Sequence, residues 1–231
     1  MNWDKNILDI IKWNGEISNL NQKQKIAEKL CKRAKNNDVI GFGSGSTSYV
    51  AMLAIVARVK EENLHITAIP TSHEIAMFCT NLNIPVASLN EVKPDWYFDG
   101  ADEVNSKGWL VKGRGGAMFR EKLIMSSTNE RYILVDDSKF VENICDKFPI
   151  PVECTPDSLC YVKSALLKLG AESVTLRLAK GKDGPIITEN GNLILDTIFR
   201  NVDENLEKEI SNIVGVLESG LFIGYNVIIE K

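Results

Sequence analysis

Short apolar runs alternate with amphipathic stretches along the first part of the chain, and this alternation constrains the fold more than any other feature. The runs have the length of buried strands, and the stretches between them have helical periodicity. The expected strands are residues 39–42, 66–69, 84–87, 96–98 and 131–135. Helices are expected at 49–59, at 74–82 and within 4–35, where two stretches have separate apolar faces. Strands that alternate with helices form right-handed crossovers around a mainly parallel sheet. The sequence therefore predicts a doubly wound α/β domain with helices on both faces of its sheet.

The pattern changes near residue 146. Residues 148–152 are extended and proline-rich, which is typical of a linker or an edge strand. Further elements follow: a helix at 157–169, a strand at 173–178, a hairpin of 186–188 and 192–196 around an Asn-Gly turn, and a helix at 203–213. We expect a smaller α+β domain at 146–217. The last strand, 225–230, is expected to return to the main sheet of a first domain made of residues 1–145 and 218–231.

Composition and charge exclude several classes of partner. The chain has 231 residues, 44% of them hydrophobic and 25% charged, and a net charge of −4 without a basic stripe, which argues against nucleic acid. The N-terminus has no apolar signal core, and no apolar run is long enough to span a membrane. The five cysteines include no CxxC pair, so neither a zinc site nor a disulfide framework is indicated. We expect a cytoplasmic protein with reduced thiols and no membrane partner.

A Gly/Ser/Thr loop, residues 43–47, lies between the first expected strand and the helix at 49–59. Unpaired N–H groups and a positive dipole make such a helix N-terminus a site for anions, and glycine lets a ligand approach the backbone. The loop lacks the lysine of a P-loop, and it departs from the dinucleotide fingerprint at Ser46. Tight-turn chemistry alone also accounts for its glycines.

Acidic and basic side chains gather between residues 97 and 122. Asp99 and Asp102 follow the expected strand 96–98, Lys112 follows a further expected strand at 109–111, and Glu121 lies on the next helix. Ligands bind at the carboxyl ends of strands in open α/β sheets. We therefore expect this segment and the loop at 43–47 to contribute to one crevice.

These side chains suit proton transfer on a sugar phosphate. Glu121 is a candidate general base if burial raises its pKa, and Lys112 can oppose a developing oxyanion. Asp99 and Asp102 can bind hydroxyl groups or move protons between oxygens. No cluster of His or Cys offers a metal site, so the developing charge must be stabilised by dipoles and charges of the protein. The set fits an aldose–ketose interconversion through an enediolate.

Ordinary structural roles account for the same residues one by one. An exposed helix-surface pair explains Glu121, turn and cap roles explain Asp99 and Asp102, and Lys139 is consistent with a solvated charge. A sugar-phosphate-sensing module without catalysis is the alternative from a different functional class. A sugar-phosphate deaminase or lactonase is the alternative among enzymes, although each would need its own catalytic histidines, and the chain has two scattered ones.

Seven separated motifs together resemble the ribose-5-phosphate isomerase family, type A, over nearly the whole chain. In order they are GFGSGSTS (41–48), YFDGADEV (97–104), KGRGGAMFREK (112–122), DDSKF (136–140), FPIPVE (148–153), NLILD (192–196) and GVLESGLF (215–222). The resemblance implies conversion of D-ribose 5-phosphate to D-ribulose 5-phosphate in the pentose phosphate pathway, without a cofactor. It also implies a Rossmann-like domain with a smaller α+β domain, assembled as a homodimer or homotetramer.

The resemblance also implies roles for individual residues. Glu121 would carry the proton between C1 and C2, Lys112 would stabilise the enediolate, Asp99 would open the furanose ring and Asp102 would contact hydroxyls. The implied substrate contacts are Ser44, Gly45, Ser46, Thr47, Asp99, Gly100, Ala101, Asp102, Lys112, Gly113, Arg114, Gly115 and Lys139. The phosphate could lie at the loop 44–47, at Lys139 or at Arg114. Arg114 stands where many members have glycine, and the tail after Phe222 is shorter than in many relatives.

Overall fold

The computed structural model describes residues 13, 14 and 16–231, which form two compact units. Unit 1 contains the described residues up to Gly100, together with Leu123–Ser138 and Val227–Lys231. Unit 2 contains Ala101–Lys122 and Lys139–Asn226. Helix α4 (Met118–Ser126) and the short 3-10 helix η2 (Asp137–Lys139) each span a boundary between them.

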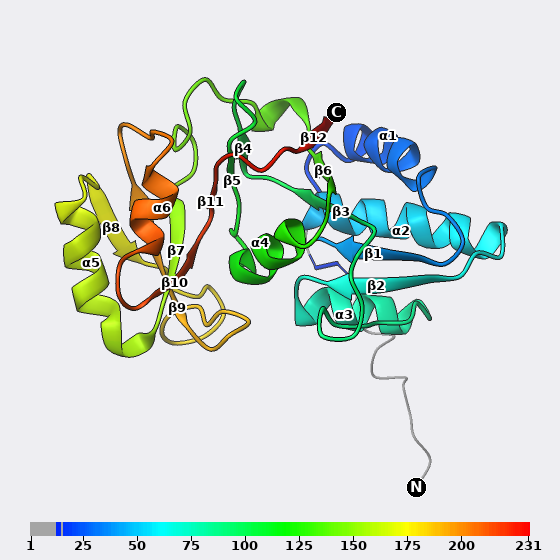
Figure 1. The fold of residues 1–231 in the computed structure, drawn as a ribbon, viewed down its shortest axis with the longest axis horizontal. Helices are drawn as coiled ribbons and strands as arrows, with labels where there is room; N and C mark the ends of the chain where they lie inside the picture. The colour runs from blue at the N-terminus through cyan, green and yellow to red at the C-terminus, as the bar shows by residue number, and fades with distance from the viewer. Residues whose placement is uncertain (1–12, 15) are drawn as a thin grey trace, which may run out of the picture. The chain divides into compact units, whose positions relative to one another are not determined.

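The sheet of unit 1 has five strands in the order β12-β6-β3-β1-β2. Its strands are β1 (Asp38–Phe42), β2 (Ile66–Pro70), β3 (Trp96–Gly100), β6 (Glu130–Leu134) and β12 (Ile228–Glu230). All four pairings are parallel, so the α/β prediction is confirmed, as is the return of the C-terminal strand to the main sheet. Strand β3 lies at the centre of the order, between β6 and β1 (Figure 1).

Helices cover both faces of this sheet, as expected. On one face, Ile40 and Phe42 of β1 and Phe98 of β3 share a core with the helices α1 (Leu20–Cys31), α2 (Ser46–Glu61) and α3 (His73–Asn81). Strand side chains alternate between faces, so Gly41 and Tyr97 belong to the other face. There a Cβ on Gly41 would lie 2.6 Å from Ile124 of α4. Tight packing on both faces fixes the strand register.

Unit 2 contains two antiparallel sheets. The larger has the order β10-β7-β9-β8 and the smaller has the order β11-β5-β4. Their strands are β4 (Glu103–Val104), β5 (Leu110–Val111), β7 (Ile150–Cys154), β8 (Ser173–Leu176), β9 (Leu193–Ile198), β10 (Val216–Ser219) and β11 (Leu221–Phe222). Helices α5 (Leu159–Lys168) and α6 (Leu206–Ser211), with the 3-10 helix η3 (Pro156–Ser158), complete the unit. The expected α+β character is confirmed.

The strand expected at residues 84–87 is wrong: these described residues form a single bridge, from Val86 to Ala68 of β2. The turn after α3 places Asn83 in the left-handed region, with φ of 60°. Pro85 has no N–H, so it contributes its carbonyl alone, which accepts the N–H of Ala68 at 2.8 Å.

Two expectations for unit 2 are also wrong. Residues 150–154 form β7, an inner strand between β10 and β9, rather than a linker or an edge. The sheet tolerates Pro151 because the carbonyl, and not the missing N–H, makes the hydrogen bond at this position. It accepts the N–H of Gly220 at 2.7 Å. Residues 186–188 are not a strand. The hydroxyl of Thr188 donates to the buried carboxylate of Glu153 at 2.6 Å, which holds this segment as a polar loop.

The second of the two helical stretches expected within residues 4–35 is α1, which ends at Cys31. Within the described chain it begins at Leu20, directly after Asn19 in the left-handed region with φ of 52°. The apolar face expected at Ile7, Leu8, Ile10 and Ile11 lies outside the described residues. No helix in the described part of the chain has the length and apolarity to cross a membrane.

Candidate functional site

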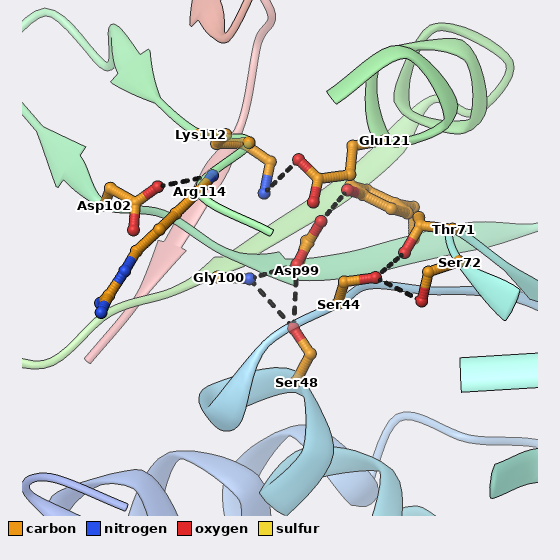
Figure 2. A network of polar contacts seen from close by, with 12 residues as sticks. Ser44, Ser48, Thr71, Ser72, Asp99, Gly100, Asp102, Lys112, Arg114 and Glu121 are labelled. Atoms are coloured by element: carbon orange, nitrogen blue, oxygen red, sulfur yellow. Dashed lines mark hydrogen bonds and ion pairs between the residues drawn. The ribbon is translucent and has the colours of Figure 1, made fainter. Parts of the chain in front are cut away.

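Asp99 lies within β3, one residue beyond the strand end expected from the sequence, and its side chain is fully buried. Figure 2 shows the carboxylate among several donors. Oδ1 accepts the Ser48 hydroxyl at 2.9 Å and the Gly100 N–H at 2.7 Å, and Oδ2 accepts the Tyr97 hydroxyl at 2.5 Å. A buried carboxylate needs such partners, and here they also fix its orientation.

Gly43 at the start of the first loop is required by the same carboxylate. A Cβ at this position would lie 2.2 Å from Cγ of Asp99, a distance that no side chain tolerates. The Gly43 N–H also donates to the Phe98 carbonyl at 2.9 Å, so the loop backbone is held against β3. Close backbone approach, rather than turn geometry alone, explains this glycine.

The rest of this loop leads into α2, whose first turn carries unpaired N–H groups and the positive end of the helix dipole. The Ser44 hydroxyl lies 2.7 Å from Thr71 Oγ1 and donates to Ser72 Oγ at 3.0 Å (Figure 2). The buried amine of Lys23 donates to the Ser46 hydroxyl at 3.0 Å. The structure thus places a cation beside a helix N-terminus.

Sequence reasoning missed Lys23. The residue precedes Ile26 and Ala27 by three and four positions, so it lies on the buried stripe of α1. A lysine on an apolar helix face was the available signal. Ser48 and Tyr97 were missed as well. Tyr97 could have been found, because residues two apart in a strand share a face.

In unit 2, Lys112 and Glu121 form a buried ion pair. Lys112 Nζ lies 3.3 Å from Glu121 Oε2, and their side chains are 2% and 5% exposed (Figure 2). Burial excludes the alternative in which Glu121 belongs to an exposed surface pair. A close pair away from water interacts more strongly than one on the surface, because the local dielectric is low.

The sequence predicts Lys112 at the carboxyl end of a strand of the parallel sheet, and that placement is wrong. Its strand, β5, belongs to the small antiparallel sheet and not to the parallel sheet of unit 1. The strand pair β5–β11 holds Lys112 instead, and its N–H donates to the Gly220 carbonyl at 2.8 Å. A Cβ on Gly220 would lie 2.0 Å from the Lys112 carbonyl oxygen, so glycine is required there.

Asp102 is partly exposed and accepts the Arg114 N–H at Oδ2, at 3.3 Å. Partial removal of the Asp102 carboxyl from water raises its pKa, and the charges of Lys112, Lys139 and Arg114 reduce that rise. The Arg114 side chain is exposed, and the Lys139 amine lies 5.3 Å from the centre of the Phe148 ring. The three cations named for the site in the sequence therefore act on one carboxyl group within unit 2.

The remaining sequence-predicted residues divide between the units. Ser44, Gly45, Ser46, Thr47 and Gly100 lie in unit 1, and Ala101, Gly113 and Gly115 lie in unit 2. Among the described side chains, no group of three or more His, Cys, Asp or Glu is arranged to hold a metal ion.

Comparison with known proteins gives a consistent result. A family model described as ribose 5-phosphate isomerase A (phosphoriboisomerase A) matches residues 67–230. A ribose-5-phosphate isomerase A from Methanocaldococcus jannaschii is 44% identical over 209 residues, which cover 89% of this chain and 92% of that protein. A relative of the same name from Synechococcus is 41% identical over 87% of this chain and 88% of that protein.

Solved structures agree with these relatives. The structure of the isomerase from Methanocaldococcus jannaschii matches with a TM-score of 0.89 at 41% identity, over 93% of this chain and 96% of that one. A structure of a D-ribose-5-phosphate isomerase in complex with phospho-erythronic acid matches with a TM-score of 0.88 at 34% identity, over the same shares.

Proposed function

The chain belongs to the ribose 5-phosphate isomerase A family, and from that premise we propose that it interconverts D-ribose 5-phosphate and D-ribulose 5-phosphate. The reaction passes through an enediolate and belongs to the non-oxidative pentose phosphate pathway. The observation that carries the proposal is the buried pair of Lys112 and Glu121, which places a base beside a cation. An aldose–ketose isomerisation through an enediolate needs a base and a group that stabilises negative charge on oxygen.

Glu121 is the proposed general base. It removes the proton from C2 of the open-chain aldose, and its protonated carboxyl group then delivers a proton to C1. The proton of the C2 hydroxyl moves to the C1 oxygen, which leaves the ketose. Negative charge develops on the sugar oxygens as the proton leaves, and the ammonium group of Lys112 stabilises it. A charge held in place by β5 and β11 needs little reorganisation during the reaction, which is the source of its catalytic benefit.

Asp99 and Asp102 are proposed to act on the hydroxyl groups of the sugar. Three donors fix the Asp99 carboxylate, which supports its role in opening the furanose ring by moving a proton between oxygens. Asp102 is held by the backbone of the loop after Lys112, which supports its role as a contact to substrate hydroxyls. Gly100 and Ala101 connect the two aspartates.

The phosphate is proposed to bind at the loop of Ser44, Gly45, Ser46 and Thr47. The N-terminus of the 16-residue helix α2 supplies backbone donors there, and Lys23 supplies a buried positive charge. Gly113, Arg114, Gly115 and Lys139 remain proposed contacts to the rest of the substrate. Phospho-erythronic acid, the ligand of one solved relative, carries both a phosphate and a carboxylate, and two oxygens on one carbon imitate part of an enediolate.

Substitution of Glu121 tests this proposal. Glu121→Gln keeps the shape of the side chain and removes the base, so ketose formation from ribose 5-phosphate should fall by about 10²–10⁴-fold. Binding of ribose 5-phosphate, measured by calorimetry, should persist. Glu209→Gln, which changes an exposed glutamate of α6 in the same unit, is the matched control and should retain full activity. Near-normal turnover by Glu121→Gln would remove its catalytic role.

We further expect a cytoplasmic homodimer or homotetramer with no nucleic-acid partner. The net charge of −4 argues against a nucleic-acid partner, and five unpaired cysteines suit a reducing compartment. The assembly is the one that the family resemblance implies. Size-exclusion chromatography with light scattering distinguishes the two assemblies.

A further inference from the structure

The side chain of Arg177 in unit 2 makes contacts that the proposed mechanism does not yet use. Arg177 directly follows β8, and its guanidinium group binds the Asp196 carboxylate of β9 through two nitrogens, Nε at 2.9 Å and Nη2. Nη1 donates to the carbonyl oxygens of Gly113 at 3.1 Å and Arg114 at 2.8 Å. One arginine thus connects a strand of the larger sheet to the loop that follows Lys112.

The backbone on both sides of this contact is fixed. The N–H of Arg177 donates to the Ile194 carbonyl at 2.9 Å, and its own carbonyl accepts the N–H of Ile186 at 3.0 Å. The Arg177 and Asp196 side chains are 13% and 20% exposed, so water competes little for the pair. Because Asp196 occupies two nitrogens of the planar fork, the direction of Nη1 is set.

Peptide planarity passes this constraint to the loop. In a trans peptide the carbonyl of one residue and the N–H of the next point in opposite directions. The Gly113 carbonyl faces Arg177, so the Arg114 N–H faces away from it, and that N–H donates to Asp102 at 3.3 Å. The Arg114 carbonyl also faces Arg177, so the Gly115 N–H points away from the guanidinium group in the same manner.

We propose that Arg177, oriented by Asp196, is a positioning residue that sets the two peptide planes after Lys112. One plane directs an N–H to Asp102, and the other presents the Gly115 N–H to a substrate oxygen. The inference rests on the proposed function, because it assigns a purpose to the orientation of the substrate loop. The residue type matters: a planar fork with five donors satisfies a carboxylate and two carbonyls together, whereas a lysine ammonium cannot reproduce that geometry.

Steady-state kinetics of variants at Arg177 test the inference. Arg177→Ala should lower kcat for ribose 5-phosphate about 100-fold and change KM less than about threefold. Misplaced catalytic groups stabilise the transition state less well, whereas substrate binding is largely kept. Arg177→Lys keeps the charge and should be impaired to a similar extent. Guanidinium ion at a concentration well below denaturation should restore part of the activity of Arg177→Ala and leave the wild type unchanged.

Lys163→Ala is the matched control, because Lys163 is an exposed cation on α5 of the same unit and does not line the cavity of Arg177 and Arg114. It should retain the wild-type kcat and KM. If Arg177→Lys retains full kcat, or if Arg177→Ala raises KM alone, Arg177 acts as a positive charge and the inference is wrong. Asp196→Asn weakens the two hydrogen bonds that orient the Arg177 guanidinium group, and it gives an independent test if Arg177→Ala does not fold. An unchanged kcat for Asp196→Asn contradicts the inference. Wild-type protein without turnover would instead contradict the proposed function.

Discussion

At the scale of single residues, the proposed chemistry depends on how buried polar groups are held. Asp99 is completely buried, and its carboxylate keeps its place through the hydroxyls of Ser48 and Tyr97 and the N–H of Gly100. The Ser48 hydroxyl has a second function, because it accepts the Gly100 N–H at 3.1 Å. One small side chain therefore stabilises both the carboxylate and the backbone beside it.

Ser48→Ala should slow opening of the furanose ring, because Asp99 loses one of its donors. Glu121, the proposed base for proton transfer between carbons, is left in place. A hydrogen bond to a charged group contributes about 1.5–3 kcal/mol, so kcat should fall by about 10–100-fold. The measurement is ketose formation from ribose 5-phosphate. Ser164→Ala, which removes an exposed helical serine of α5, serves as the control. If Ser48→Ala matched that control, the support given to Asp99 would be irrelevant to catalysis.

The residue types of the site could be predicted from the sequence, whereas their environments could not. Glu121 and Lys112 were predicted by the chemistry of an isomerase, but sequence alone could not distinguish a buried Glu121 from an exposed one. Its burial follows from packing between segments far apart in the chain. Lys23 was missed for the converse reason, since a lysine is normally expected in solvent.

At the scale of secondary-structure elements, β11 supports Lys112, the proposed active-site lysine. Its pairing with β5 places Gly220 directly against the backbone of Lys112. The nearest atoms to a Cβ there are the Lys112 carbonyl oxygen and the ring of Pro151. The strand therefore couples the C-terminal GVLESGLF motif to the lysine through backbone contact.

Gly220→Ala should displace this contact. A Cβ would lie 2.0 Å from the Lys112 carbonyl oxygen and 2.5 Å from Pro151 Cγ, so backbone atoms must move. Overpacking of this kind costs about 1–3 kcal/mol in the free energy of unfolding, which urea titration measures. Activity should fall in the fraction that remains folded. Gly181→Ala, where a Cβ meets no atom within 4 Å, is the control. Equal stability of the two variants would show that β11 accommodates the methyl group.

A second element, β12, is tied to α1 by Glu230. Its carboxylate, 3% exposed, pairs with Lys29 and with Arg33 Nη2 at 3.1 Å. Burial works to raise the pKa of Glu230, but hydrogen bonds and charges from Lys29 and Arg33 outweigh burial and lower it. A lowered folded-state pKa gives stability that is present above the unfolded value of about 4.3. That stability is lost as the pH falls through the folded-state pKa.

Glu230→Gln should therefore destabilise the protein in a pH-dependent manner. We expect a loss of about 1–2 kcal/mol in the free energy of unfolding at pH 7, below that of a fully buried pair because Lys29 and Arg33 are partly solvated. The difference from the wild type should shrink when unfolding is repeated well below pH 4.3. A difference of the same size at both pH values would exclude the ion pair as its cause.

Two of the corrected placements share a physical cause. Residues 150–154 have the composition of an edge strand. Only the carbonyl of Pro151 is needed for hydrogen bonding in the sheet, so the proline does not prevent β7 from lying between β10 and β9. Residues 109–111 have the pattern of a strand, but nothing local specifies which sheet they join. Local sequence identifies extended segments, and pairing between distant segments decides their position.

At the scale of the whole molecule, the proposed catalytic groups are divided between two units. The boundary between Gly100 and Ala101 falls inside the DGAD motif, so Asp99 belongs to unit 1 and Asp102 to unit 2. The proposed phosphate loop and Lys23 are in unit 1, whereas Lys112 and Glu121 are in unit 2. The domain boundaries at residues 145 and 218 and the homo-oligomeric state remain predictions.

The central claim is that Glu121 moves a proton between two carbon atoms of ribose 5-phosphate. Nuclear magnetic resonance of the reaction in deuterium oxide tests it most directly. The wild-type protein should form ribulose 5-phosphate that carries deuterium at C1, because the proton on the Glu121 carboxyl group exchanges with solvent while the enediolate exists. Glu121→Gln should form ketose, labelled or unlabelled, much more slowly than the wild-type protein does. Ketose formation by Glu121→Gln at a rate comparable to that of the wild type, or no ketose from the wild-type protein, would contradict the account.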